Sequence, residues 1–365
     1  MTANIPMYLA ADGLTTAIPL ILSIEYVEIT VPWDATSASV ALTKGQNTAN
    51  CVPFGSINTG NGWSYTRNML FDIYFSAGSV VAERVQAISA ETSSNVISVF
   101  VVEFNPLCVN VQQGTFTLNN GSSTTNASIT AVDLNKAALV FSWKHAGTTL
   151  YPYSFLIRGR ITSIDELTFD RGSTFTDASG HFFVFEAINS EFSVQAVTFT
   201  INSDSTFASI NAVDLSKTIL LGSFYSPSAD NTKRLYTIGL FLGDSSTINQ
   251  ISYSASTKPR VVSAFVVSFA KGVAVQRGSL TWGYDDLTQS VALGTAIDKT
   301  KAIVNPIQPE GFYWLNSTDY NLPMSIVAKL SFNGDGAEVH GARTKEVGFA
   351  SDPGTTYFEV VEFDF

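Results

Sequence analysis

Polar and apolar residues alternate in short runs along this 365-residue chain, and clusters of turn residues separate the runs. Val27-Glu28-Ile29-Thr30-Val31 is one such run. An alternation with a period of two predicts a β-strand that has one face towards solvent. No stretch longer than three turns shows the helical period of 3.6 residues, so we expect very little helix.

A more apolar phrase returns four times, at intervals of 82 to 94 residues. Its copies are Phe100-Val101-Val102-Glu103-Phe104 and the segments 183–186, 265–269 and 360–363. Regular self-similarity is the signature of a repeated architecture. We therefore predict an all-β fold, a tandem array of about four related small β-sandwich or barrel modules with little helix. The predicted division is an N-terminal arm at 1–23 and modules at 24–105, 106–189, 190–270 and 271–365.

Two further phrases recur inside the modules. A Val-Gln phrase occupies 111–117, 194–200 and 275–281, with a weaker copy at 27–31. A second phrase contains Asp133, Asp214 or Asp298, each followed closely by Asn, Ser or Thr. Such side chains hydrogen-bond to nearby backbone, which favours a turn. We predict that the three aspartates are structural and that the strands on either side of each turn form a hairpin.

Residues 1–23 lie outside the repeat, but they are too apolar for a free tail. Two interpretations are open. The segment is an arm that packs on a neighbouring module or on another subunit, or it is the first strand of module 1. The joins between modules, such as 104–109 and 270–273, are short and lack a Gly/Ser linker, so the array should be stiff.

The composition indicates a well-buried globular protein, with 45% hydrophobic and only 14% charged residues. The net charge is −11, from 20 basic and 31 acidic residues, and no basic cluster is present. Binding to nucleic acid or to an anionic membrane is therefore not expected. The first basic residue is Lys44, so the N-terminus lacks the basic region of a signal peptide, and accumulation in a cytoplasm is expected.

The residues that usually carry chemistry are scattered. Cys51 and Cys108 match no metal-ligand spacing; two buried thiols are the favoured interpretation and a disulfide is the alternative. His145, His181 and His340 lie in different modules without a ligand partner nearby in sequence, which predicts surface or hairpin histidines.

Two short motifs resemble functional sites but read better as turns. Gly243-Asp244-Ser245 resembles a lipase-type nucleophile motif, yet both flanks read as strands. Asn333-Gly334-Asp335-Gly336 lacks the spaced acidic ligands of a calcium loop, so it predicts a tight hairpin turn. We therefore predict no catalytic residue, no cofactor-binding residue, no metal site, and a protein that is not an enzyme.

Three aromatic residues are candidates for contact with a glycan or a protein partner. Trp63 and Tyr65 adjoin the glycine-rich segment Gly60-Asn61-Gly62, and Trp314 ends the run Phe312-Tyr313-Trp314. Aromatic side chains beside a flexible tip suit stacking on sugar rings. The alternative is that these residues pack within their own modules.

Together the three phrases resemble repeats in structural proteins of tailed-bacteriophage virions. The Val-Gln phrase at 111–117, the Asp phrase at 131–136 and the closing phrase at 100–104 carry the resemblance, with their later copies. It covers most of residues 24–365. Module 1 departs from the pattern at its turn, and module 2 departs at Ala187, where the other copies have Phe.

The resemblance implies a bacteriophage virion structural protein that acts by subunit assembly, as a capsid decoration, collar, tail or fibre component. Its expected location is the virion, after synthesis in the host cytoplasm. Expected partners are other virion proteins and further copies of the same chain, as a homo-oligomer. A host-surface glycan-binding receptor protein is the alternative function, with a host surface glycan as partner, and a glycan depolymerase is a third, less favoured one.

Overall fold

The computed structural model describes residues 18–58, 70–87, 94–146, 156–172, 174–202, 207–227, 238–252, 259–282, 286–306, 312–314, 323–325, 329–342 and 354–364. Antiparallel strands make up most of this part of the chain, together with 3-10 turns at Thr48–Asn50 (η1) and Leu215–Lys217 (η3). The predicted all-β array is confirmed.

The strands fall into four sets of one topology, which we call modules 1 to 4. Module 1 contains β1 (Ile21–Val31), β2 (Ser37–Ala41), β3 (Cys51–Asn58), β4 (Asp72–Ser76), β5 (Ser79–Glu83) and β6 (Asn95–Phe104). Module 2 contains β7 (Val109–Leu118), β8 (Thr124–Ser128), β9 (Ala137–His145), β10 (Ile157–Ser163), β11 (Glu166–Arg171) and β12 (Ala178–Ala187).

Modules 3 and 4 repeat this plan. Module 3 contains β13 (Phe192–Ile201), β14 (Phe207–Ser209), β15 (Thr218–Tyr225), β16 (Ile238–Asp244), β17 (Thr247–Ser252) and β18 (Arg260–Phe269). Module 4 contains β19 (Val273–Trp282), β20 (Thr288–Ala292), β21 (Ala302–Pro306), β24 (Lys329–Phe332), β25 (Glu338–Ala342) and β26 (Gly354–Phe363), and it adds the pair β22 (Phe312–Trp314) and β23 (Pro323–Ser325).

Each module is a sandwich of two three-stranded sheets. The inner sheet has the first, sixth and third strands in that order, and the outer sheet has the second, fifth and fourth. The sixth strand (β6, β12, β18 or β26), which we call the closing strand, is therefore the middle strand of the inner sheet. This order is that of a long antiparallel ribbon rolled up on itself, as in jelly rolls.

The Asp-containing turns do not form hairpins, which corrects the prediction. In module 2 the turn joins β8 of the outer sheet to β9 of the inner sheet. A turn that crosses between sheets needs no pairing of its flanking strands. The true hairpins join the fourth and fifth strands. Two predicted turns lie at such hairpins and are confirmed: Gly243-Asp244-Ser245 between β16 and β17, and Asn333 to Gly336 between β24 and β25.

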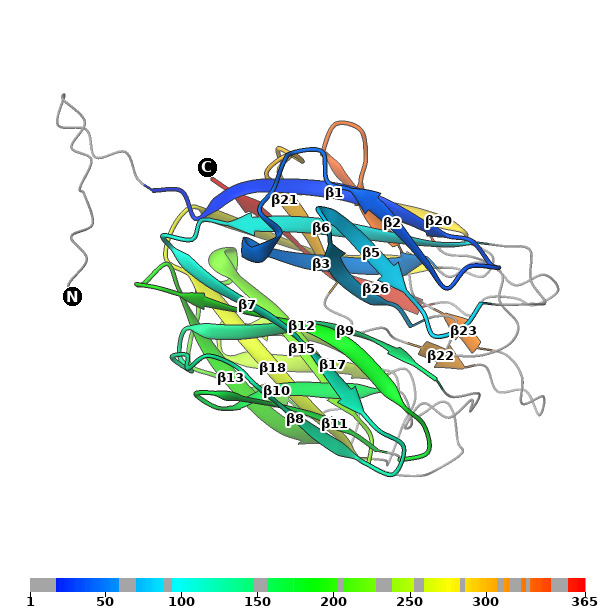
Figure 1. Ribbon diagram of the computed structural model, residues 1–365. Coiled ribbons are helices and arrows are strands. Elements are labelled where there is room, and N and C mark those ends of the chain that lie inside the picture. The colour runs from blue at the N-terminus through cyan, green and yellow to red at the C-terminus, as the bar shows by residue number, and fades with distance from the viewer. Residues whose placement is uncertain are drawn as a thin grey trace.

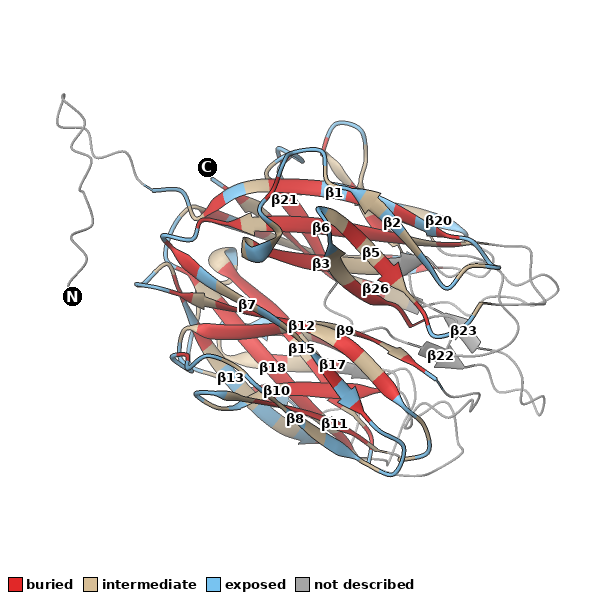
Figure 2. Ribbon diagram, viewed as in Figure 1, coloured by how far each residue is buried: buried red, intermediate tan, exposed pale blue. Residues whose placement is uncertain are grey.

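The closing strands are continuously apolar because both of their faces are buried. Val99 and Val101 of β6 point into the sandwich of module 1, among the buried side chains of β1, β4 and β5. Phe100, Val102 and Phe104 point the other way, into a second core that continues through modules 2, 3 and 4. Figure 2 shows β6 buried along most of its length. In module 1 the apolar phrase thus marks the strand that separates two cores.

The four modules close into a ring. Modules 1 and 4 occupy one half of the molecule and modules 2 and 3 the other (Figure 1). The fourth strand of a module contacts the inner sheet of the next, and that contact also returns from module 4 to module 1. Register-equivalent residues carry it. The backbone N–H of Ile73, Gly159 or Leu330 donates to Ser142 (2.7 Å), Ser223 (3.0 Å) or Ser56 (2.9 Å), respectively.

The contact between modules 3 and 4 uses aromatic rings at the same register. Phe241 stacks on Tyr357 with ring centroids 5.3 Å apart, as Tyr74 stacks on His181 between modules 1 and 2. Near the joins, ring contacts lead from Phe104 through Phe185 and Phe192 to Phe269 and Phe363. The array is therefore one closed body, and the larger of its two cores continues through all four modules.

The chain enters the ring through β1, which begins at Ile21, so the last three residues of the predicted arm belong to a strand. Before it, the Pro19 carbonyl accepts a hydrogen bond from Asn105 Nδ2 at 2.9 Å. Residues 1–17 lie outside the described residues. The weaker Val-Gln copy at 27–31 is not the structural equivalent of the others. Val111 pairs with Phe185 of the closing strand, and the module 1 equivalent of Phe185 is Val102, which pairs with Ile24 and not with Val27. The strand pairing therefore makes Ile24-Glu25 the first copy.

Glycines in the Val-Gln phrase make room for a ring. A Cβ on Gly114 would lie 2.4 Å from Cζ of Phe182, its partner in the closing strand, and a Cβ on Gly278 would lie 2.5 Å from Cζ of Phe358. In modules 1 and 3 the equivalent pairs are Val27 with Val99 and Val197 with Ala264. A glycine thus occurs where the partner is Phe, and a valine where the partner is small.

Candidate functional site

The polar residues that recur in each copy of the repeat form hydrogen bonds inside their own modules. Gln112 donates from Nε2 to the Thr130 carbonyl (2.9 Å) and accepts the Thr130 N–H (2.7 Å). Gln195 with Asn211 and Gln276 with Thr295 make the same two bonds. Each of these side chains therefore links the first strand of its module, through two hydrogen bonds, to the backbone of the loop that follows the second strand.

Glu25 holds the equivalent position in module 1, opposite Val101. Its carboxylate accepts hydrogen bonds from the amides of Thr43 and Lys44. Burial alone would raise the pKa of Glu25, but these hydrogen bonds outweigh it and hold the pKa below its ordinary value. The carboxylate is therefore a structural acceptor and stays ionised at neutral pH.

The Asp phrase and the closing phrase meet at each turn. Asp214 accepts the Ser216 amide at 2.9 Å, and Asp133 and Asp298 make the equivalent bond, so these aspartates have the structural role that the sequence predicts. Hydrogen bonds from the hydroxyl and amide of Ser216 lower the pKa of Asp214. In modules 2 and 4 the glutamate of the closing phrase then accepts the amide of the turn's first residue, as Glu186 does from Asp133 at 2.6 Å.

A polar cluster spans modules 1 and 2 and is the strongest arrangement of potentially catalytic groups among the described residues. Asp72 Oδ2 lies 2.7 Å from His181 Nδ1, and Asp72 Oδ1 accepts the His181 backbone N–H at 2.9 Å. Tyr74 stacks on the imidazole. Ser142, paired in register with His181, donates to Asp72 at 3.3 Å. Serine, histidine and aspartate therefore meet here, from β9, β12 and β4.

The geometry does not make Ser142 a nucleophile. A triad needs the serine hydroxyl bonded to the imidazole, and the imidazole bonded in turn to the aspartate. Here the Ser142 hydroxyl is bonded to the N–H and C=O of Ile73 and to Asp72. Ser223 makes the same pair of bonds to Gly159 between modules 2 and 3, where the neighbouring groups are different. The serine at this position therefore forms a hydrogen bond between modules that recurs along the array.

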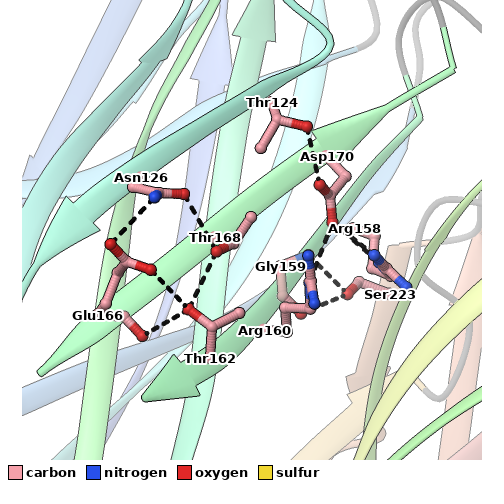
Figure 3. A network of polar contacts seen from close by, with 10 residues as sticks. All are labelled: Thr124, Asn126, Arg158, Gly159, Arg160, Thr162, Glu166, Thr168, Asp170 and Ser223. Atoms are coloured by element: carbon pink, nitrogen blue, oxygen red, sulfur yellow. Dashed lines mark hydrogen bonds and ion pairs between the residues drawn. The ribbon is translucent and has the colours of Figure 1, made fainter. Parts of the chain in front are cut away.

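A second polar network covers the outer sheet of module 2 (Figure 3). Asp170 binds Arg158 (2.6 Å) and Arg160 (3.1 Å) through Oδ2 and accepts the Thr124 hydroxyl through Oδ1. Glu166 lies four residues earlier on the same strand face, about 13 Å away along the chain. Because both Asp170 oxygens are occupied and the second carboxylate is distant, the network does not form the carboxylate pair of a glycosidase.

A third group lies buried between modules 3 and 4. Glu359 accepts hydrogen bonds from Arg277 (3.0 Å), from Asn305 (3.1 Å) and from the Leu220 backbone N–H (2.9 Å). Burial raises the pKa of Glu359 despite the opposing effect of Arg277. In the other modules its register position holds a phenylalanine, so this carboxylate is a polar substitute for an apolar contact between modules.

His145 and the two cysteines have structural roles. His145 is buried and bonds through its ring to the Thr176 hydroxyl, so the prediction of a surface or hairpin position is wrong for it. Both cysteines are buried and free, which confirms the favoured interpretation over the disulfide. Burial, together with the charge of Glu103, raises the pKa of the Cys51 thiol to about 12, which makes it unreactive.

The aromatic candidates fall only partly within the described residues. Trp63 and Tyr65 lie outside them. Trp314 lies at the end of β22, paired with Pro323 of β23. All three belong to the connection between a third and a fourth strand, in module 1 or in module 4. Those two modules are neighbours in the ring, because β24 and β21 both contact β3.

The end of the ring that carries the joins between modules also carries exposed apolar side chains. Ile18, Leu107 and Ile188 are 56%, 59% and 47% exposed, and Leu134 is also exposed. We call these four residues the join patch. They lie on adjoining segments. Asn105 bonds to Pro19, the Ile188 N–H donates to the Cys108 carbonyl at 2.8 Å, and the Ala187 N–H donates at 3.1 Å to the Lys136 carbonyl in the turn that contains Leu134. Sequence reasoning missed this surface, although an apolar residue in a short polar join is a readable signal.

No family model and no curated protein matches this chain. Among the described residues, no group of three or more His, Cys, Asp and Glu side chains is placed to hold a metal ion. A search of the same residues finds no helix of the length and hydropathy that a membrane span requires.

Proposed function

We propose that this protein is a structural subunit of a bacteriophage virion and that it acts by assembly with further copies of itself and with other virion proteins. The supporting observation is the use of its polar residues. The recurring Gln, Glu, Asp and Ser side chains are bonded within a module or between modules, in a closed ring with a continuous core. The resemblance of the three phrases to repeats in virion proteins supplies the biological context.

The physical properties of the ring suit this role. A body closed by four similar interfaces resists local opening, because no module has a free inner face. Three of its exposed apolar residues, Ile18, Leu107 and Ile188, lie on adjoining segments at the joins between modules. Exposed apolar patches on an otherwise well-buried protein are typical of surfaces that meet a partner.

Mass spectrometry of gradient-purified particles of the encoding phage tests the proposal, together with light scattering of the purified protein. We expect the protein at a fixed copy number per particle and a solution mass above that of one 39.3 kDa chain. A strictly monomeric protein that is absent from particles would refute the proposal. If such a protein also cleaved a polysaccharide, a glycan depolymerase would replace it.

A host-surface glycan receptor is the second candidate, and one observation favours it. Trp63, Tyr65 and Trp314 belong to equivalent connections of two modules that are neighbours in the ring. Trp63→Ala and Trp314→Ala should each weaken binding to purified host-surface polysaccharide, because the stacking of an indole ring on a sugar ring is lost. Ile164→Ala, an exposed residue of the β10–β11 hairpin, is the control and should bind as the wild type does.

A further inference from the structure

The join patch lies where the N-terminal segment enters the ring. Ile18 is the first described residue and is itself part of the patch. The next residue, Pro19, is held by Asn105 Nδ2, and Asn105 also receives the Leu107 N–H on its side-chain oxygen at 3.0 Å. The seventeen preceding residues therefore start beside an apolar surface whose side chains are about half exposed.

The N-terminal segment has the chemistry of an apolar ligand. Residues 1–17 contain Ile5, Met7, Tyr8, Leu9 and Leu14 and a single charged side chain, Asp12. Fully extended, seventeen residues span up to about 60 Å. Transfer of the apolar side chains of such a segment from water to an apolar surface is favourable, because it removes apolar area from water.

The apolar residues of the segment lie far along the chain from its own point of entry. Eight residues, 10 to 17, separate Leu9 from Ile18, and fully extended they span up to about 30 Å. Ile5, Met7, Tyr8 and Leu9 can therefore reach the join patch of a neighbouring copy in the assembly.

We propose that the join patch of one copy receives the N-terminal segment of a second copy, so that residues 1–17 link subunits of the assembly. The inference rests on the proposed function, since it names the surface through which that function's homo-oligomer forms. Its contacts are Ile18, Leu107, Leu134 and Ile188 on one chain and the apolar residues of the segment on the other.

Cross-linking between two full-length variants tests this contact. One chain carries Leu9→Cys and the other Leu107→Cys; they are mixed, oxidised mildly and mapped by peptide mass spectrometry. We expect a link between positions 9 and 107 of different chains. The matched control is Phe207→Cys, because Phe207 is about as exposed as Leu107 and lies in β14, in the outer sheet of module 3. Its link to position 9 should be at least about tenfold weaker.

Three results decide the inference. Equal linking to positions 107 and 207 would overturn it. So would a doubly substituted Leu9→Cys/Leu107→Cys chain that links only within itself, because the segment would then cover its own patch. As an independent measure, Leu107→Ser/Ile188→Ser should raise the dissociation constant of the oligomer at least about tenfold, with unchanged circular dichroism, whereas Phe207→Ser should not.

The two proposals fail separately. If the cross-link forms but the protein is absent from purified particles, the docking stands and the virion role falls. If the protein is present in particles and position 9 does not link to position 107, the virion role stands and the docking is wrong.

Discussion

Replacing Gly278 by alanine should destabilise the protein by about 1–2 kcal/mol. The new Cβ would lie 2.5 Å from Cζ of Phe358, whereas carbon atoms in contact are normally about 3.5–4.0 Å apart, so the ring must move by about 1 Å. Phe358 is fully buried, so the ring can move only by displacing its neighbours. Overpacking of this kind costs about 1–3 kcal/mol, and the lower chain entropy of alanine offsets up to about 1 kcal/mol.

A double-mutant cycle isolates the contact between the two positions. Gly278→Val/Phe358→Val copies the Val27–Val99 pair of module 1. Phe358→Val alone leaves a cavity and should cost about 2–3 kcal/mol, while Gly278→Val alone should cost at least as much as the alanine. The double variant should be more stable than the sum of the two changes by at least about 1 kcal/mol.

Equilibrium unfolding in urea at 25 °C, followed by tryptophan fluorescence, measures these values, provided that the slope of the transition is unchanged. Gly334→Ala is the control, because a Cβ there would meet no atom within 4 Å, and its effect should stay within about 0.5 kcal/mol. If Gly278→Ala is as stable as the wild type, or if the single changes add up to the double within about 0.5 kcal/mol, the ring of Phe358 is not what excludes a side chain.

Three further substitutions test other parts of the structure. Asp214→Ala should lower the melting temperature modestly. Asp214→Asn should not, because Asn47 accepts the same turn hydrogen bond in module 1. Equal shifts of the melting temperature for the two variants, measured by calorimetry, would contradict the structural role. Because the pKa of Glu25 is lower in the folded protein, its carboxylate contributes stability above about pH 4.5, and this contribution is lost as the pH falls. Glu25→Gln introduces the residue of the other modules and should therefore reduce the loss of unfolding free energy between pH 6 and pH 3. Parallel pH profiles of the variant and the wild type would contradict this. Ser98→Ala removes a buried bond to the Leu330 carbonyl and should speed amide exchange in β24 before the rest of the ring, whereas uniform exchange would argue against a separate closing contact.

The sequence by itself determined the module. Period-two alternation, turn residues and the four copies of an apolar phrase follow from local rules, and they predicted the all-β class and the repeat. The structural role of Asp133, Asp214 and Asp298 was also readable, because a side-chain bond to the amide two residues later depends only on neighbours in sequence. The pairing of the strands beside those turns was not readable, since a turn and a crossing between sheets have the same local signal.

The tertiary structure alone decided how the modules meet. The sequence indicated a stiff array, and the structure closes it into a ring in which Leu330 of module 4 bonds to Ser56 of module 1 across 274 positions. Asp72 and His181 come together across 109 positions without any spacing rule that could have joined them. Their partners are fixed by the packing of whole sheets against a common core, and that packing sums many weak contacts that no single sequence window contains.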